Sequence, residues 1–382
     1  MTDRLRKVFI IAGEVSGDAL GAKLMEAMRA RLGNKVSFEG VGGEAMAGEG
    51  LTSLFDMHDI AVMGFSAVIA RLPTLITRIN RTAEAVLDAK PDILVIIDSP
   101  DFTHRVARKV RAVRPDIPVV DYVCPSVWAW RSSRARAMRA YVDHVLALLP
   151  FEPKTLETLN GPKATYVGHP LFSTFPARKK GERAAHEKRR LLILPGSRRG
   201  EVSRLLPLFN ETLKELHQRR SDLDLVLPAV PRLLPLIEAS VRDWPVQPKI
   251  VTTPAEKIAA FACADAALAA SGTVCLELAL AGVPMISTYK LDPIARRLRF
   301  LVTTWSANLP NLIVDYPVVP EYIDEFIKPA GLARLLDRLL SDTPERAAQL
   351  AAFATIRSLM ATPGDKAPAD MAADTIIAMM RA

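Results

Sequence analysis

The chain has 382 residues, of which 49% are apolar and 24% charged, and its formal net charge is +8. This length predicts two or three domains, and this apolar content is enough for a large core, which excludes a chain that is disordered throughout. The positive charge indicates an acidic partner, such as a phosphorylated substrate, an anionic lipid or a nucleic acid.

The first apolar run and the cysteines exclude further classes of protein. The run VFIIAG (8–13) ends at Glu14, too early for a signal peptide, and no uncharged apolar run is long enough to span a membrane. Cys124, Cys263 and Cys275 lie far apart in the sequence, which argues against a disulfide framework and a zinc site. We therefore expect a cytoplasmic chain.

Short β-rich apolar runs alternate with amphipathic segments, a pattern typical of βαβ units and parallel sheets. The charged stretch 172–190 has no apolar period, so we expect a linker there between two series of strands. The predicted strands are 8–12, 36–41, 92–98, 119–123, 144–149 and 164–168 before the linker, and 191–196, 223–229, 249–252, 264–270 and 284–288 after it.

Each series of strands predicts a doubly wound α/β domain that binds its ligand at the carboxyl ends of its strands. We place these domains at 1–171 and 191–343, and two such domains that face each other would form a cleft. The Ala-rich helical segment 344–382 could cover the second domain or return to the first.

Two strand ends of the first domain carry acidic residues. In AGEVSGD (12–18), Glu14 and Asp18 would repel a phosphate, so we expect this turn, with Ser16, to bind hydroxyl groups. In IIDSPDF (96–102), Asp98 ends a strand, where a partly buried carboxylate can act as a general base. The alternative is that Asp98 and its neighbouring aspartate only cap the next helix.

Three other features of the first domain leave their interpretation open. The uncharged segment 60–70 is too short to span a bilayer and is either a core helix or an apolar lip that meets a lipid surface. Trp128 and Arg131, in YVCPSVWAWR (122–131), could contact a sugar, line an acyl pocket or pack in the core. His169 is either a hinge residue or faces the cleft.

The second domain contains two turns that suit a phosphate. After strand 191–194, Gly196 allows a close backbone approach at a helix start, and Arg198 can add a bidentate contact. Ser271 and Thr273, after strand 264–270, either form a similar site or only cap the helix. The chain has no GxxxxGK[ST] or GxGxxG pattern, which argues against a P-loop and weakens an NAD-binding interpretation.

Glu277 lies one turn into the apolar helix that follows Thr273 and needs a partner. A ribose diol and a local Lys or Arg are the two alternatives. With the phosphate-style turns, it predicts a nucleotide held by the second domain.

Nine motifs that occur in order across residues 12–313 resemble the lipid-A-disaccharide synthase family. They are AGEVSGD, VMGFSAVI, IIDSPDF, YVCPSVWAWR, PFE, VGHPL, LPGSR, SGTVCLELALAGVPM and LPNLI. The resemblance implies a GT-B glycosyltransferase, a hexosyltransferase with two Rossmann-like domains facing across a cleft and a C-terminal helix returning to the first. It also implies transfer of 2,3-diacylglucosamine from its UDP derivative to 2,3-diacylglucosamine 1-phosphate (lipid X), which yields a β-1,6-linked disaccharide 1-phosphate and UDP.

The resemblance also implies roles for individual residues. Asp98 is the candidate base of a single inverting displacement. The candidate UDP-binding residues are Gly196, Ser197, Arg198, Ser271, Gly272, Thr273, Glu277 and Asn311. The acceptor-side candidates come from the residues discussed above and are Glu14, Ser16, Asp18, Trp128, Arg131 and His169. The candidate membrane-facing or acyl-binding residues are Met63, Phe65, Val68, Ile69, Leu72, Leu75 and Ile76.

Three positions depart from the family pattern, in which Thr103 is usually Asn, Ala67 is usually Glu and Cys124 is usually Ser. The threonine can still form hydrogen bonds, and cysteine for serine is a small change. Because Ala67 lacks a carboxylate, an acid–base role for that position is in doubt, which favours Asp98 as the base.

The expected partners are the two acylated sugars and the inner face of the inner membrane, on which the protein would dock peripherally, with no nucleic acid; a homodimer is left open. No carboxylate cluster accompanies the predicted turns, so we expect no metal and no cofactor. Three alternatives would keep the UDP site: a GT-B enzyme with a soluble UDP-sugar, a UDP-sugar epimerase and a sensor that binds UDP without releasing any.

Overall fold

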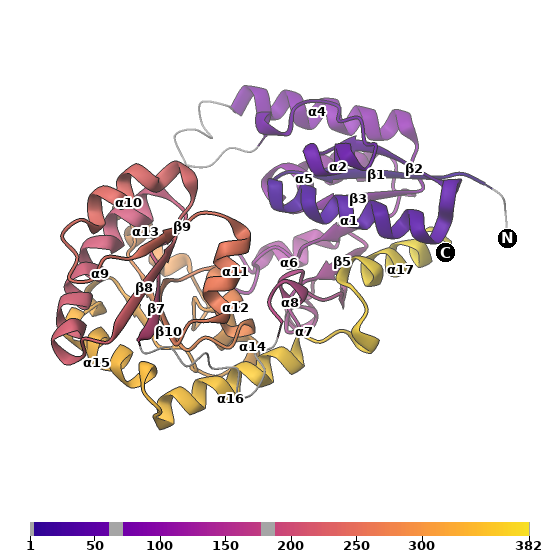
Figure 1. The fold of residues 1–382 in the computed structure, drawn as a ribbon. Coiled ribbons are helices and arrows are strands. Elements are labelled where there is room, and N and C mark those ends of the chain that lie inside the picture. The colour runs from indigo at the N-terminus through magenta and orange to yellow at the C-terminus, as the bar shows by residue number, and fades with distance from the viewer. Residues whose placement is uncertain (1–3, 61–71, 177–187, 382) are drawn as a thin grey trace. The chain divides into compact units, whose positions relative to one another are not determined.

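The structure is a computed structural model that describes residues 4–60, 72–176 and 188–381. It divides into two compact units, one formed by residues 1–169 with 362–382 and the other by residues 170–361 (Figure 1). Each unit contains a six-stranded sheet in which all neighbouring strands are parallel.

The first unit has the strand order β2-β1-β3-β4-β5-β6. Its strands are β1 (Arg6–Ala12), β2 (Val36–Val41), β3 (Ile93–Ile97), β4 (Val119–Tyr122), β5 (His144–Ala147) and β6 (Lys163–Tyr166). Its helices are α1 (Val15–Leu32), α2 (Glu44–Gly48), α4 (Leu72–Ala89), α5 (Pro100–Val113), α6 (Ser133–Met138), α7 (Glu152–Thr158) and α17 (Pro368–Arg381), with 3₁₀ turns η1 (Gly33–Lys35), η2 (Met57–Asp59) and η6 (Pro363–Asp365).

The second unit has the strand order β12-β11-β10-β7-β8-β9. Its strands are β7 (Arg189–Leu194), β8 (Leu223–Pro228), β9 (Lys249–Val251), β10 (Ala266–Ala270), β11 (Met285–Tyr289) and β12 (Glu321–Ile323). Its helices are α8 (Leu171–Thr174), α9 (Arg199–Arg219), α10 (Leu234–Val241), α11 (Pro254–Ala262), α12 (Thr273–Leu280), α13 (Pro293–Leu298), α14 (Leu309–Val314), α15 (Pro329–Leu340) and α16 (Pro344–Leu359), with 3₁₀ turns η3 (Pro231–Leu233), η4 (Arg299–Leu301) and η5 (Asp324–Phe326).

The strands are apolar without alternation because helices cover both faces of each sheet. In β3, all five residues are buried. Leu94 and Ile96 join the core cluster that includes residues of α4 and α5, whereas Val95 and Ile97 join the cluster that includes residues of α1 and α17. Alternate side chains of this one strand thus pack into two separate cores, one on each face of the sheet.

All eleven predicted strands are present, and β12 was not predicted. Its three residues, Glu321–Ile323, are too short and too polar to stand out as an apolar run. The expected linker 172–190 contains α8 and the start of β7, and its residues 177–187 lie outside the described part of the chain. Charge concealed the start of β7, where Arg190 pairs with Asp224 of β8 at 2.7 Å.

The C-terminal helices are divided between the units. In α16, the Gln349 amide bonds both backbone groups of Met285, at the start of β11, at 2.8 and 3.0 Å. In α17, Asp370 and Asp374 form ion pairs with Arg31 of α1, beside which α17 lies in Figure 1. The chain therefore leaves the first unit near residue 170 and re-enters it at 362.

Each sheet reverses its strand order once, which creates a crevice at the carboxyl ends of the strands. In the first unit the reversal lies between β1 and β3, and in the second it lies between β7 and β10. The turns that follow Ala12, Ile97, Leu194 and Ala270 therefore occupy the two places where such folds bind ligands.

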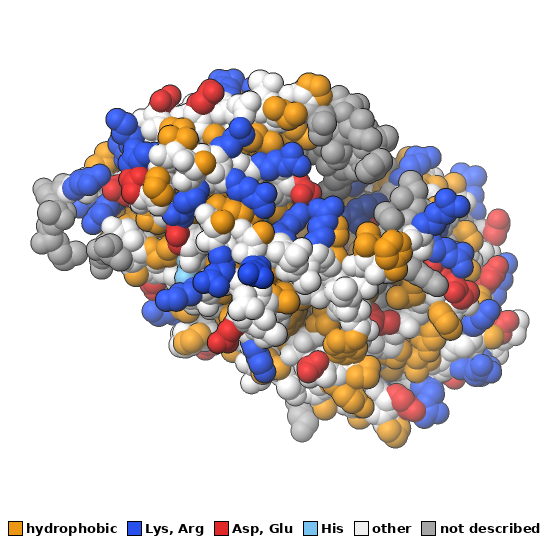
Figure 2. Space-filling model, turned by 180° about the vertical axis from the view of Figure 1, so that it is seen from behind, with side chains coloured by type: hydrophobic (Ala, Val, Ile, Leu, Met, Phe, Trp, Pro, Cys, Tyr) orange, Lys and Arg blue, Asp and Glu red, His pale blue; other side chains and the backbone are white. Residues whose placement is uncertain are grey.

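The surface combines positive charge with exposed apolar side chains. Figure 2 shows Lys and Arg side chains over much of one face of the molecule, with hydrophobic side chains between them. Within the described ranges, no helix has the length and apolar content needed to cross a bilayer.

We predict that Gly40→Ala destabilises the first unit strongly. Gly40 pairs with Ile10 across β1 and β2 at a φ of +150°, and a Cβ there would lie 1.8 Å from the Ile10 carbonyl oxygen. Moving that backbone should lower the free energy of unfolding by about 3 kcal/mol, measured by denaturant titration. Gly48→Ala is the matched control, because no atom lies within 4 Å of its added Cβ. Equal losses in both variants would contradict the packing argument.

Candidate functional site

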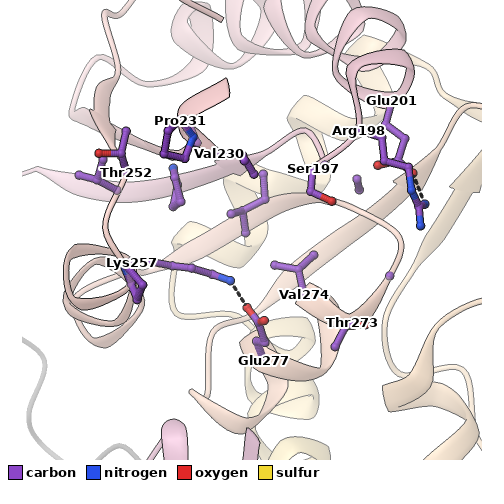
Figure 3. Close-up of a pocket in the computed structure, with 18 of the residues that line it drawn as sticks. Ser197, Arg198, Glu201, Val230, Pro231, Thr252, Lys257, Thr273, Val274 and Glu277 are labelled. Carbon is purple, nitrogen blue, oxygen red and sulfur yellow. Dashed lines mark hydrogen bonds and ion pairs between the residues drawn. The ribbon is translucent and has the colours of Figure 1, made fainter. Parts of the chain in front are cut away.

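A cavity of about 550 Å³ lies at the strand-order reversal of the second unit (Figure 3). Four turns line it: Gly196–Arg198 after β7, Ala229–Pro231 after β8, Thr252–Pro254 after β9 and Ser271–Thr273 after β10. This volume is typical of a small-molecule or cofactor site. The predicted UDP-binding residues of both phosphate-style turns therefore line one cavity.

Three helices begin at this cavity, namely α9, α11 and α12. The start of α11 is closed by a capping box between Thr253 and Glu256, whereas α9 and α12 have no side-chain cap. First-turn amides carry partial positive charge, so uncapped helix starts suit an anion such as a diphosphate.

The turn after β7 requires a glycine. Gly196 has a φ of +106°, and a Cβ there would lie 2.7 Å from Oε2 of Glu201. The same carboxylate accepts a hydrogen bond from Nη1 of Arg198 at 2.8 Å, while the Arg198 side chain remains 64% exposed. Glu201 therefore orients Arg198 at the rim of the cavity.

Glu277 has the local partner that was one of its two alternatives. Nζ of Lys257, from α11, lies 2.5 Å from Oε2 of Glu277 on the wall of the cavity (Figure 3). A ligand in the cavity would meet this ammonium and carboxylate together. Lys257 was not among the predicted site residues, because α11 shows no motif.

Asn311, predicted near UDP, does not line the cavity. It is buried, its Oδ1 accepts from the amides of Val318 and Val319, and its Nδ2 donates to Ser306 and to the Val319 carbonyl. Ser271 reaches the same segment through the Ala307 carbonyl at 3.2 Å. Asn311 therefore supports the loop against which the cavity turn rests, since all its polar atoms have partners there.

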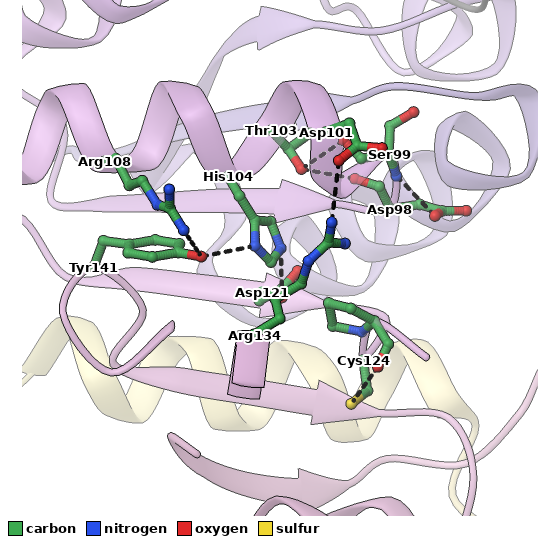
Figure 4. A network of polar contacts seen from close by, with 11 residues as sticks. Asp98, Ser99, Asp101, Thr103, His104, Arg108, Asp121, Cys124, Arg134 and Tyr141 are labelled. Atoms are coloured by element: carbon green, nitrogen blue, oxygen red, sulfur yellow. Dashed lines mark hydrogen bonds and ion pairs between the residues drawn. The ribbon is translucent and has the colours of Figure 1, made fainter. Parts of the chain in front are cut away.

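Asp98 and Ser99 stand at the strand-order reversal of the first unit in consecutive left-handed conformations, with φ values of +56° and +47° (Figure 4). Thr103 holds this turn, since its hydroxyl lies 2.8 Å from the Asp98 carbonyl and 3.1 Å from that of Ser99. Threonine thus supplies a hydrogen bond at the position where the motif resemblance implied asparagine. Such strained backbone persists only where its surroundings determine it, and it is common at functional sites.

The capping alternative for the aspartates is not what the structure shows. Helix α5 begins without a side-chain cap. Oδ1 of Asp98 accepts from the amide of Ser99 at 2.7 Å, and Asp101 pairs with Arg134 at 3.1 Å. The half-buried Asp98 carboxylate therefore stays at the strand end, where a base was predicted.

The turn after β1 passes directly beside the turn after β3. A Cβ at Gly13 would lie 2.1 Å from Cβ of Ser99. Glu14 is half-buried and Ser16 exposed next to this contact. Two of the predicted acceptor-side residues therefore follow a turn that packs against Ser99, the residue next to Asp98.

Asp18, which was predicted on the acceptor side, is not available to bind a ligand hydroxyl. It is 4% exposed, and its carboxylate accepts from the amides of Gly43, Ala45 and Met46 at 2.7, 2.9 and 3.1 Å. These amides belong to the start of α2, which needs acceptors. Asp18 therefore holds α2 in place, which its sequence motif could not reveal.

The loop after β4 is held by Glu152, the last residue of the motif PFE, which was not among the predicted site residues. Glu152 is 3% exposed, its Oε2 accepts from the amides of Leu148 and Leu149, and its Oε1 accepts from Nε1 of Trp128 at 3.3 Å. Burial raises the pKa of Glu152 to about 7. Trp128 also meets Phe151 edge to face, at 5.5 Å between ring centroids, so this half-buried ring packs against the loop after β5.

Of the other predicted residues of the first unit, Arg131 is exposed and His169 is half-buried. The exposed Arg131 guanidinium stacks on Trp130 at 4.3 Å from the ring centroid. His169 is the last residue of the unit before the chain crosses over, and burial lowers its pKa to about 4. The histidine is therefore neutral near pH 7.

A buried polar network lies between α5 and β4. Nε2 of His104 lies 3.0 Å from Oδ2 of Asp121, and its Nδ1 lies 3.2 Å from the Tyr141 hydroxyl, to which Arg108 donates (Figure 4). Burial raises the pKa of Asp121. The available signal was Asp121 itself, an acidic residue inside the apolar run VVDYV.

The predicted membrane-facing residues are only partly described. Met63, Phe65, Val68 and Ile69 lie outside the described residues, as does the side chain of Leu72. Leu75 packs partly buried against the core, whereas Ile76 is 47% exposed.

Comparison with known proteins identifies the family. A family profile described as "Lipid-A-disaccharide synthetase" matches residues 8–372. The chain is 52% identical over 385 residues to a lipid-A-disaccharide synthase of Rhodopseudomonas palustris (strain HaA2), covering 100% of this chain and 98% of the relative. It is 51% identical over 384 residues to one of Nitrobacter winogradskyi, covering 98% and 96%.

The chain belongs to the lipid-A-disaccharide synthase family. It is therefore a glycosyltransferase of lipid A biosynthesis, as the motif resemblance implied.

Solved structures with low sequence identity share the fold. The glycotransferase of kitacinnamycin superposes with a TM-score of 0.64 at 14% identity, covering 99% of this chain and 100% of that chain. MurG of Acinetobacter baumannii gives 0.61 at 16%, covering 98% and 99%, and a co-structure of S. aureus MnaA with UDP gives 0.60 at 13%, covering 97% and 95%. The fold is GT-B, with two Rossmann-like α/β units.

We predict that Glu152→Gln flattens part of the pH dependence of stability. The raised pKa means that the folded protein favours the neutral carboxyl, so its contribution is present at low pH and is lost as the pH rises through about 7. Between about pH 5 and pH 8, the free energy of unfolding of the parent should therefore fall by up to ~3 kcal/mol more than that of the variant. Denaturant titrations at both pH values measure this difference, and parallel slopes would contradict it.

Proposed function

We propose that this protein transfers 2,3-diacylglucosamine from its UDP derivative to the 6-hydroxyl of lipid X, with inversion at the anomeric carbon. The observation that carries the proposal is the cavity of the second unit, where two uncapped helix starts and Arg198 suit a nucleoside diphosphate. A UDP co-structure of the same fold is consistent with this choice of ligand.

The chemistry is one displacement. Asp98 removes the proton of the acceptor hydroxyl while its oxygen bonds to the anomeric carbon, and the bond from that carbon to the diphosphate oxygen breaks. The electron pair stays on the departing UDP. Arg198 and the turns at Gly196 and Ser271–Thr273 stabilise that charge, and one preorganised donor of this kind contributes roughly 3 kcal/mol.

The backbone at Asp98 supports its proposed role as the base. The left-handed conformations of Asp98 and Ser99 direct the turn, Thr103 restrains it through two carbonyls, and the Gly13 turn packs against it. A base held by its surroundings needs little reorganisation when the acceptor binds, which is the basis of catalysis by positioning.

The proposed substrates carry acyl chains, so we also propose peripheral docking on the inner face of the inner membrane. The net charge of +8 suits anionic lipid headgroups, and the exposed Ile76 leaves an apolar side chain available on α4. We propose that the reaction needs neither metal nor cofactor.

The test of the whole proposal is UDP release in detergent with EDTA, from UDP-2,3-diacylglucosamine with and without lipid X. We expect acceptor-dependent UDP together with a disaccharide 1-phosphate peak by mass spectrometry. UDP released equally without acceptor, or no disaccharide, would overturn the proposed substrates. A reaction that proceeds without EDTA but is lost when EDTA is added would overturn the proposed independence of metal.

Asp98→Asn should abolish turnover and leave UDP binding unchanged. Asparagine tolerates the left-handed conformation but cannot accept the proton, so we expect a decrease in kcat of roughly 10²–10⁴-fold. Asp101→Asn is the control, because Asp101 lies on the same helix start and its side chain is 76% exposed. Near-normal kcat for Asp98→Asn would exclude it as the base.

Arg198→Ala should weaken UDP binding. The variant loses a charged donor and leaves the Glu201 carboxylate facing the ligand, which should cost roughly 2 kcal/mol, or about 30-fold in Kd. Titration calorimetry with UDP measures the change. Arg199→Ala, at the adjacent exposed arginine, should bind like the parent, and similar Kd values for all three proteins would remove Arg198 from the site.

A further inference from the structure

Exposed apolar side chains gather in one short segment of the second unit. Phe300, Leu301, Val302 and Trp305 are 73%, 48%, 53% and 53% exposed. They lie in η4 and the residues directly after it, following α13. Single exposed apolar residues are normal in proteins, but four within six residues form a patch that needs an explanation.

A second segment extends this patch. Arg296 of α13 pairs with Glu325 of η5 at 3.2 Å and lies 3.9 Å from Asp324, so η5 packs beside α13. Phe326, which follows Glu325, is 68% exposed. Phe300 lies in η4, which follows directly after α13. We call this surface the α13–η5 face, which comprises Arg296, Arg297, Phe300, Leu301, Val302, Trp305 and Phe326.

The α13–η5 face also carries positive charge. Residues 290–305 contain four basic residues, Lys290, Arg296, Arg297 and Arg299, and one acidic residue, Asp292, while η5 adds Asp324 and Glu325. Arg297 is exposed and has no ion pair within the described part of the chain, and Arg296 remains 57% exposed despite its ion pairs. Arginines beside Phe and Trp are typical of segments that lie in a membrane interface.

The face lies at the same sheet edge as the UDP cavity. It follows the carboxyl end of β11, two strands from β7. Arg204 of α9, the helix that begins at the cavity, donates to the carbonyl of Lys290 at 3.1 Å. The α13–η5 face is therefore linked through Arg204 to the helix that begins at the cavity.

We propose that the α13–η5 face docks on the surface of an anionic phospholipid bilayer. The aromatic and aliphatic side chains enter the interface shallowly, while Arg296 and Arg297 contact headgroup phosphates. The segment is short, and the exposed Arg297 beside these apolar side chains favours headgroup phosphates over a second protein surface. This inference concerns the second unit alone and depends neither on residues 62–76 nor on the proposed reaction.

The test is flotation of the full-length protein with phosphatidylcholine vesicles, with and without phosphatidylglycerol, and without any sugar substrate. Leu301→Ser is compared with Leu359→Ser, since these leucines of the same unit are 48% and 46% exposed. Arg297→Glu is compared with Arg334→Glu, an equal charge change at an exposed arginine of α15. UDP binding by every variant controls for folding.

We expect the parent to bind vesicles that contain phosphatidylglycerol. Binding should be weaker by about fivefold or more for Arg297→Glu, and it should also be reduced for Leu301→Ser. Both control variants should bind like the parent. In addition, brominated lipid should quench the fluorescence of Trp305, an effect that Trp305→Phe removes.

Three results would overturn the proposal: no binding by the parent, equal binding by test and control variants, or unchanged quenching in Trp305→Phe. A loss of self-association in Leu301→Ser without any change in flotation would assign the face to contacts between copies instead. Because no substrate is present, each of these results leaves the proposed transferase reaction untouched. No binding by the parent would also contradict the peripheral docking proposed above, whereas equal binding by test and control variants would contradict only the α13–η5 face.

Discussion

The hydrogen-bonded pairing of β1 with β3, and of β7 with β10, determines where both sites lie. The register sets Ala12 beside Ile97 and Leu194 beside Ala269, so the turns after each pair emerge at the same level. Since the following helices cover opposite faces of the sheet, the turns diverge and leave a crevice. In the first unit this brings Gly13 against Ser99 beside Asp98, and in the second it opens the cavity.

Buried carboxylates hold the loops around these crevices. Asp18 binds the amides that begin α2, Glu152 joins the loops after β4 and β5, and Glu201 positions Arg198. A buried carboxylate is costly unless its oxygens accept hydrogen bonds, so each of these residues requires one local backbone arrangement. Asp98 differs from them because it is half-buried, at the end of a strained turn. The contrast separates residues that shape the loops from one that is free to meet a substrate.

Sequence reasoning identified features that depend on local order. The apolar runs located all eleven predicted strands, and the small residues after β7 and β10 located the cavity turns. It missed β12, an edge strand that is recognised by its pairing with β11 and not by an apolar run. It also assigned Asp18 and Asn311 to ligands, whereas both accept hydrogen bonds from backbone amides. The sequence of a motif does not show whether a polar residue binds a ligand or a neighbouring amide.

The sequence by itself determined the α/β architecture, the family and the turn residues, because periodicity, glycine and motif order are properties of the chain alone. Only the tertiary structure decided which polar side chains have protein partners. Lys257 meets Glu277 from another helix, His104 meets Asp121 across α5 and β4, and Arg296 meets Glu325 beside Phe326. These contacts join residues that lie 17 to 29 positions apart in the sequence, and they form only after strands and helices have packed. No local pattern could therefore specify them.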